Sequence, residues 1–131
     1  MLADLVRRAF DAFNRGDIDG LLELLDPDIR IHSLMTEPER ADYHGYEGVR
    51  EWYAAVFEVF PDWRPQPREI QEFGDATLLR FDVTATAASS GVRIEQSYWQ
   101  AGRFRDGLIT FYGFYRSEDE ARRALGLETA G

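Results

Sequence analysis

The chain has 131 residues, a formal net charge of −9, 44% hydrophobic residues and 14% aromatic residues. This length and apolar content suit one core, so we expect a single domain over residues 1–131. The negative charge disfavours nucleic acids and anionic membrane surfaces, which proteins bind with clustered basic side chains. No apolar run approaches the roughly 20 residues that span a bilayer. We therefore expect neither a nucleic-acid partner nor a membrane partner.

Missing residue types narrow the chemistry further. The sequence has no cysteine and all 15 basic residues are arginine, which excludes disulfides, thiolate nucleophiles and lysine Schiff bases. His32 and His44 are the two histidines, and their spacing forms no H-x-x-H ligand pair. We expect no bound metal and no cofactor. The N-terminal MLADLVRRAF is typical of an amphipathic helix and not of a signal peptide, so the expected location is the cytoplasm.

The first part of the chain predicts two helices and a short strand. Apolar residues recur at steps of three and four from Leu2 to Phe13, as in an amphipathic helix. Asp17 is suited to cap a second, short helix, which Asp26-Pro27 is expected to end. A brief strand is expected from Ile29 to His32.

A polar loop and a third helix are expected next. The loop, MTEPERADYHG over residues 35–45, is expected at the mouth of whatever the fold encloses. The third helix presents one apolar stripe and ends before Pro61. The stripe consists of Val49, Trp52, Tyr53, Val56, Phe57 and Phe60.

The second half of the chain changes to a period of two, which predicts four strands linked by turns. Their expected bounds are 64–73, 76–87, 92–104 and 108–115. Ser117 and Glu120 form a capping box for a final short helix. The expected fold is α+β, a cone-shaped curved antiparallel sheet wrapped around three N-terminal helices, because each layer has one apolar face to bury.

Three segments carry a resemblance to a known family. FNRGDIDGLLELLDPDIRIHS, YHGYEGVREWYAAVFEVFPDW and RFRDGLI resemble the SnoaL-like, ketosteroid-isomerase-like branch of the nuclear-transport-factor-2-like superfamily. Its members include ketosteroid isomerase, polyketide cyclases, epoxide hydrolases and binding or scaffold modules. The resemblance implies a pocket for an apolar small molecule and usually a homodimer, and it leaves the reaction open.

The resemblance allows the catalytic positions of ketosteroid isomerase to be compared one at a time. Its general-base aspartate falls on Ser33, and its oxyanion-hole tyrosine falls on Ala9. Its protonated aspartate falls on Gln100, and the supporting tyrosine is retained as Tyr53. Because a serine cannot act as a base near neutral pH, the comparison argues against classical steroid isomerisation.

Arg80-Phe81-Asp82 looks like part of the Asp-Arg-Asp site of the family's epoxide hydrolases. The strand register argues against this role, since Phe81 belongs to the apolar face of the strand and its two neighbours belong to the polar face. The second acid position falls near Gly113, which has no side chain to offer. We expect Arg80 and Asp82 to form a pair at the surface.

His32 is the one group of the expected site that titrates near neutrality, and it lies beside the mouth loop that carries Asp42. These two residues are the candidate catalytic residues, with proton transfer as their expected role. The other interpretation is a partly exposed histidine at a strand end and a solvated carboxylate. The sequence leaves both interpretations open.

Neutral side chains form the rest of the expected site. Gln96, Tyr98 and Gln100 share one face of their strand, and the family alignment turns that face inward. An aromatic chamber with a few hydrogen-bonding groups suits an apolar ligand with carbonyl or hydroxyl groups, such as a polyketide or terpenoid. Ordinary core packing is the competing interpretation. The expected substrate-binding residues are Ser33, Trp52, Tyr53, Phe57, Gln96, Tyr98, Gln100, Tyr112 and Phe114.

Two classes of function remain at this point. The first is an isomerase or cyclase that orients an apolar substrate and transfers a proton. The second is a ligand-binding or dimeric scaffold module without catalysis. A homodimer is expected in either class, since alternation places Trp99 on the outer face, opposite to Tyr98 and Gln100, where we expect it to be exposed.

Overall fold

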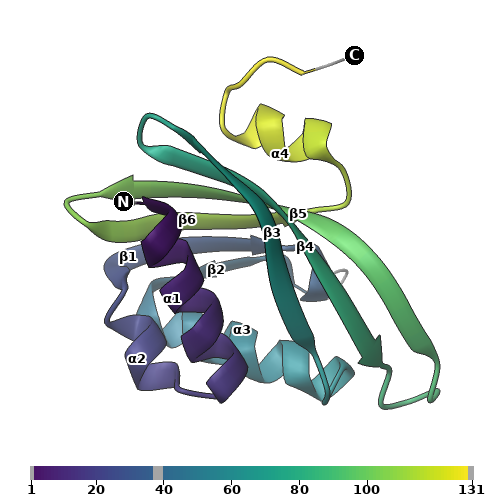
Figure 1. Cartoon of the computed structure of the whole chain (residues 1–131). Coiled ribbons are helices and arrows are strands. Elements are labelled where there is room, and N and C mark those ends of the chain that lie inside the picture. Colours follow the sequence, from purple (N-terminus) through teal and green to yellow (C-terminus); the bar gives the residue numbers. More distant parts are fainter. Residues whose placement is uncertain (1, 37–39, 130–131) are drawn as a thin grey trace.

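The structure, a computed structural model, describes residues 2–36 and 40–129 (Figure 1). The helices are α1 (Leu2–Arg15), α2 (Ile18–Leu22), α3 (Gly45–Val59) and α4 (Glu118–Ala124), with a short 3-10 helix at Leu34–Thr36. The strands are β1 (Leu25–Ser33), β2 (Asp42–His44), β3 (Arg64–Phe73), β4 (Ala76–Thr86), β5 (Arg93–Arg105) and β6 (Leu108–Tyr115). No helix within the described residues has both the length and the apolar sequence needed to span a bilayer.

The six strands form one sheet in the order β2-β1-β6-β5-β4-β3. Neighbouring strands are antiparallel except for β1 and β6, which are parallel. The sheet is therefore mixed: the predicted meander of β3 to β6 is antiparallel, and β1 joins it through a parallel pair that the sequence did not predict. A parallel pair needs a long crossover, and α3 with the intervening strands supplies it between β1 and β6.

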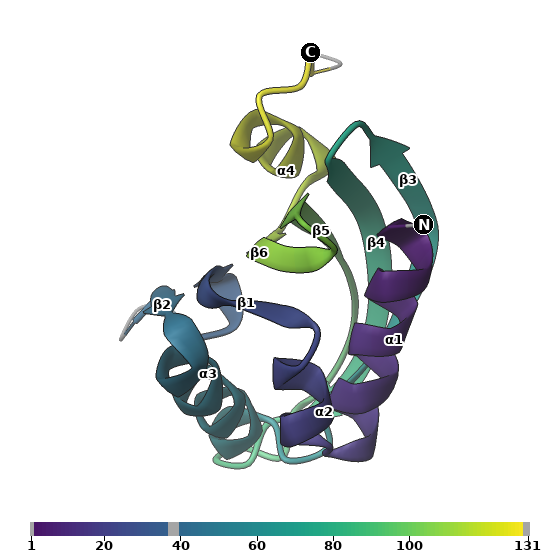
Figure 2. The same ribbon diagram turned by 90° about the vertical axis from the view of Figure 1, so that its left-hand side faces the viewer.

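The sheet curls around α1, α2 and α3, and α4 lies against its other face (Figure 2). Alternate residues of β4 face the helical layer, and Leu79, Phe81 and Val83 are at most 3% exposed. Phe81 packs against Phe10 of α1 with the ring centroids 6.2 Å apart. This confirms the apolar face predicted for the strand and places the main core inside the cone.

The bounds predicted for the second helix and the first strand differ from those in the structure. The second helix ends at Leu22, and β1 begins at Leu25 and includes Asp26-Pro27. The pairing of β1 with β6 shifts register between Leu25 and Arg30. A proline has no N–H to donate, and it is tolerated at such an irregularity. The predicted mouth loop contains β2, and its residues 37–39 lie outside the described residues.

The predicted N-cap is present at the start of α4, where the Ser117 hydroxyl also donates to Glu120 Oε1 at 3.2 Å, and it has a testable consequence. Ser117 Oγ accepts a hydrogen bond from the Glu120 N–H at 3.2 Å. We expect Ser117→Ala to lower the free energy of unfolding by about 1 kcal/mol in urea denaturation. Ser89→Ala, at an exposed position of the β4–β5 turn, serves as a control with an expected change of less than about 0.5 kcal/mol. Equal stability of both variants would contradict the role of the cap.

Candidate functional site

A cavity of about 40 Å³ lies between the helical layer and the inner face of the sheet. Its wall is built from α1, α2, α3 and all strands except β2, so every layer of the cone contributes to it. Most of the side chains of the wall are aliphatic or aromatic. The fifteen described residues that line it are Ala9, Phe10, Phe13, Leu21, Leu25, Ile31, Val49, Trp52, Val56, Trp63, Pro65, Phe81, Gln100, Tyr112 and Phe114.

Three residues of this wall carry buried polar atoms without a hydrogen-bond partner among the described residues. These atoms are Trp52 Nε1, Gln100 Nε2 and the Tyr112 hydroxyl, on residues that are 6%, 2% and 5% exposed. Phe114 neighbours all three residues, because it pairs with Gln100 across the sheet and its ring centroid lies 5.6 Å from that of Trp52 and 6.0 Å from that of Tyr112. The cavity therefore has a polar side within an otherwise apolar wall.

The polar side of the cavity is rich in hydrogen-bond donors. An indole Nε1–H and an amide Nε2 donate and do not accept, and a phenol hydroxyl can donate. Burial raises the pKa of Tyr112, and the neighbouring Gln100 side chain partly offsets this increase. The Gln100 amide lies beside the hydroxyl without completing a hydrogen bond to it. Tyr112 thus stays protonated at neutral pH, and the natural complement of the three groups is an acceptor oxygen.

The structure places four of the predicted substrate-binding residues in the wall, namely Trp52, Gln100, Tyr112 and Phe114. Ser33 is buried in register with Phe114, and its Oγ has no partner among the described residues, but it does not line the cavity.

The other predicted substrate-binding residues lie outside the wall. Tyr53 and Phe57 are half-buried and pack on Phe13, with centroids 5.2 and 5.5 Å from its ring. Tyr98 is half-buried and lies 5.7 Å from the Phe81 ring, and Gln96 is exposed. Tyr53 and Tyr98 therefore do not converge with Gln100 on the cavity in this structure.

His32 and Asp42 are brought together, but on the outer side of the sheet. His32 Nδ1 lies 2.8 Å from Asp42 Oδ1, and the imidazole stacks on the Tyr115 ring at 5.5 Å. The adjacent residues of β1, Ile31 and Ser33, are buried on the inner side. Alternation along β1 thus separates the histidine–carboxylate pair from the cavity by the thickness of the sheet.

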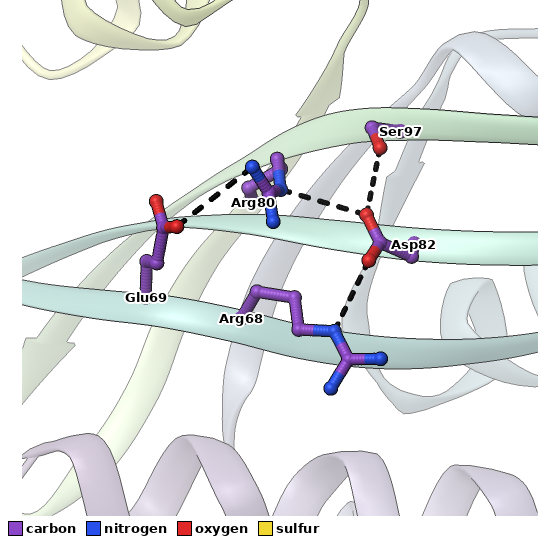
Figure 3. A network of polar contacts seen from close by, with 5 residues as sticks. All are labelled: Arg68, Glu69, Arg80, Asp82 and Ser97. Carbon is purple, nitrogen blue, oxygen red and sulfur yellow. Dashed lines mark hydrogen bonds and ion pairs between the residues drawn. The ribbon is translucent and has the colours of Figure 1, made fainter.

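Arg80 and Asp82 also lie on the outer face, in a polar network that crosses three strands (Figure 3). Asp82 accepts hydrogen bonds from Ser97 Oγ at 2.7 Å and Arg68 Nε at 3.1 Å, and its Oδ1 lies 3.5 Å from Arg80 Nε. The Ser97 hydroxyl, and then Arg68, lower the pKa of Asp82. Arg80 also pairs with Glu69 at 3.8 Å. The predicted surface pair is confirmed, and the arrangement does not offer an epoxide-hydrolase site inside the cone.

The part of the wall contributed by α1 and by Trp63 is absent from the predicted substrate-binding residues. The periodicity of the first helix predicts an apolar face packed against the sheet, but it does not show that Ala9, Phe10 and Phe13 border a cavity. Trp63 is 6% exposed although it follows the end of α3. An aromatic residue two positions after the helix-ending Pro61 was the available signal.

A curled sheet around three helices, with a mainly apolar internal cavity, defines a small cone-shaped α+β pocket domain. A sequence model described as the SnoaL-like domain matches residues 6–112. The chain belongs to the SnoaL-like domain family. No curated protein matches the chain at a significant level.

Solved structures share the fold over nearly the whole chain. An NTF2-like protein of unknown function from Burkholderia pseudomallei is 25% identical, with a TM-score of 0.79 over 92% of this chain and 94% of that one. TerC co-crystallised with polyporic acid is 20% identical, with a TM-score of 0.77 over 95% and 97%. A putative polyketide cyclase from Sinorhizobium meliloti is 24% identical, with a TM-score of 0.70 over 85% and 93%.

Proposed function

We propose that this protein binds a neutral, apolar ring compound inside the cone and orients it through a carbonyl or similar acceptor oxygen. The main support for this proposal is that the wall of one cavity holds three buried donors without hydrogen-bond partners among the described residues, at Trp52, Gln100 and Tyr112. A buried donor left unpaired costs about 1–3 kcal/mol. An acceptor oxygen placed among the three donors offsets that cost.

The wall of the cavity favours a ligand without charge. All fifteen lining side chains are neutral at pH 7, and three of them carry the unpaired donors. A charged group moved into such surroundings loses its hydration without gaining an opposite charge. A polyketide-like or terpenoid-like ketone matches this wall, because it is largely apolar and carries few oxygens.

The volume of the cavity sets a condition on binding. About 40 Å³ holds roughly three water molecules, whereas pockets for ring compounds measure about 300–1,000 Å³. Aromatic side chains must therefore move outward when a ring compound enters. We propose that the half-buried rings of Tyr53, Phe57 and Tyr98, which pack on wall residues, form the outer wall of the expanded chamber.

A matched pair of ligands tests the proposal. 1-Tetralone and tetralin share their two rings and differ in one carbonyl group. Calorimetry on the unmodified protein is expected to show that the ketone binds about tenfold more tightly, since one carbonyl can complete more than one hydrogen bond. Equal affinities, or no binding of either compound, would refute an acceptor-binding site.

The reaction we propose is isomerisation or cyclisation of a polyketide- or terpenoid-like ketone. Donors that hold a carbonyl oxygen also stabilise the negative charge that develops on it when a neighbouring carbon loses a proton. A putative SnoaL-like polyketide cyclase from Jannaschia, 20% identical with a TM-score of 0.73, has the same fold. The predicted proton-transfer pair, His32 with Asp42, lies on the outer face of the sheet and could take part only if the ligand reached that face. Because the fifteen described lining residues include no base that works near neutral pH, the geometry favours the second candidate, a ligand-binding module without catalysis.

Proton exchange separates the two candidates. Proton NMR follows the exchange of the protons next to the carbonyl of 1-tetralone in deuterated water. An enzyme of this class is expected to accelerate the exchange, with a loss in Gln100→Leu, and a loss in His32→Gln would assign the base. Tight binding of the ketone without acceleration would establish the non-catalytic module.

We also propose a homodimer formed through the outer face of the sheet. Trp99 on this face is half-buried, because it packs against the small core under α4, and is thus less exposed than expected. The remaining outer face carries both signs of charge, including Arg68, Asp82 and Glu95, and a two-fold axis can pair unlike charges across it. Light scattering at micromolar concentration is expected to give twice the chain mass. A monomer would contradict this interface.

A further inference from the structure

The wall of the cavity has one residue that belongs to neither a helix nor a strand. Trp63 lies in the connection over residues 60–63, between the end of α3 and the start of β3, and every other described lining residue belongs to a regular element. Hydrogen bonds within helices and between strands fix the backbone of those elements. The connection is the part of the wall that can move without breaking a helix or the sheet.

Backbone hydrogen bonds hold the start of this connection, because the Phe60 N–H donates to the Val56 carbonyl at 2.9 Å and the Ala88 N–H donates to the Val59 carbonyl at 2.9 Å. Asp62 Oδ1 accepts a hydrogen bond from the Thr86 N–H at 2.7 Å, which ties the connection to the end of β4. The Trp63 N–H donates to the Phe60 carbonyl at 3.0 Å. The carboxylate of Asp62 is exposed, so this tie lies at the surface. Figure 1 shows the end of α3 beside the start of β3 and the β4–β5 hairpin.

The Trp63 ring lies between the buried cavity and a partly exposed group of aromatic side chains. Its inner side faces the cavity, and the ring itself is 6% exposed. On its other sides lie Phe60 and Tyr98, both half-buried, with centroids 5.3 and 6.3 Å away. The indole therefore separates the cavity from a partly exposed aromatic surface.

We propose that Trp63 is the gate of the cavity and determines the size of the ligand it accepts, with Asp62 as the residue that holds the gate closed. This inference rests on the proposed function, because it concerns the entry of a ligand into the same cavity. An indole ring system is larger than benzene, and apolar cavities on the order of 150 Å³ bind benzene. Outward movement of Trp63 alone enlarges the chamber by more than one aromatic ring.

The first test measures the rate of entry. Stopped-flow fluorescence follows the binding of 1-tetralone to the unmodified protein, to Asp62→Ala and to Ser117→Ala. Loss of the tie to Thr86 raises the population of the open gate, so Asp62→Ala is expected to associate several-fold faster even though its urea midpoint falls. Ser117→Ala loses a comparable side-chain bond on the far side of the sheet, and its association rate is expected to stay unchanged.

A purely structural role for Asp62 predicts the opposite pattern. The association rate would then stay the same or fall in Asp62→Ala, in parallel with stability, and this result would overturn the gate. If 1-tetralone binds to neither the unmodified protein nor Trp63→Ala, the proposed function itself fails. If 1-tetralone binds normally and Asp62→Ala has an unchanged association rate, the gate is refuted and the proposed function stands.

The second test measures the size limit with cyclohexanone, 1-tetralone and anthrone, which carry one carbonyl on one, two and three rings. Trp63→Ala is expected to bind anthrone at least tenfold more tightly than the unmodified protein does, with little change for cyclohexanone. Trp63→Phe keeps an aromatic ring at this position and is expected to show an intermediate gain, which guards against poor folding of the alanine variant. An equal size preference in all three proteins would overturn the assignment of Trp63.

Discussion

Replacing Phe81 with alanine is expected to lower the free energy of unfolding by about 3–5 kcal/mol. Phe81 is 1% exposed and stands between the sheet and the helical layer. Its ring lies 6.2 Å from Phe10, 5.7 Å from Tyr98 and 5.9 Å from Phe114. Truncation removes contacts to three elements at once and leaves a void beside the existing cavity, which the surrounding helices and strands cannot close.

Urea denaturation measures this loss, with Val92→Ala as the control. Val92 is 58% exposed beside the β4–β5 turn, so its truncation is expected to change stability by less than about 0.5 kcal/mol. A loss below about 1 kcal/mol in Phe81→Ala would show that the core under the sheet is not packed around this residue.

Removing the donors of the cavity is expected to weaken ketone binding without weakening the fold. Gln100→Leu and Tyr112→Phe are each expected to reduce the affinity for 1-tetralone by about 2- to 12-fold, the effect of one neutral hydrogen bond. Affinity for tetralin is expected to stay nearly constant. Since neither Gln100 Nε2 nor the Tyr112 hydroxyl has a partner among the described residues, the unfolding free energy of both variants is expected to hold or rise.

A control variant and a pH series test this prediction further. Gln96→Leu changes an exposed glutamine on the same side of β5 and is expected to leave ketone binding unaltered. Burial raises the pKa of Tyr112, so the hydroxyl stays protonated, and the affinity of the unmodified protein is expected to be constant from about pH 6 to about pH 9. Reduced stability together with unchanged ketone affinity in the donor variants would assign both residues to the core instead of a ligand site.

The sequence predicted the elements whose pattern is local. The apolar alternation of β4, the N-cap at Ser117 and the stop at Pro61 each depend on neighbours in the chain, and each is present in the structure. The parallel pairing of β1 with β6 was not predictable in this way, because it joins segments separated by most of the domain.

The candidate site shows the same division between local and distant information. Alternation correctly placed Gln96, Tyr98 and Gln100 on one face of β5, opposite Val83, Phe81 and Leu79. Alternation could not show how deeply each of these three side chains is buried. Gln96 is exposed, Tyr98 is half-buried and Gln100 is 2% exposed, because the helical layer covers only one end of this face. The polar residue beside Gln100 in the wall of the cavity is accordingly Tyr112 and not Tyr53.

The most direct test of the central claim is the infrared carbonyl band of 1-tetralone, labelled with carbon-13 at the carbonyl, when it is bound to the protein. Donors at Trp52, Gln100 and Tyr112 are expected to shift the band to lower frequency than in a hydrocarbon solvent, and the shift should shrink in Gln100→Leu and Tyr112→Phe. A bound ketone whose carbonyl absorbs as it does in hydrocarbon would contradict an oriented acceptor oxygen in this cavity.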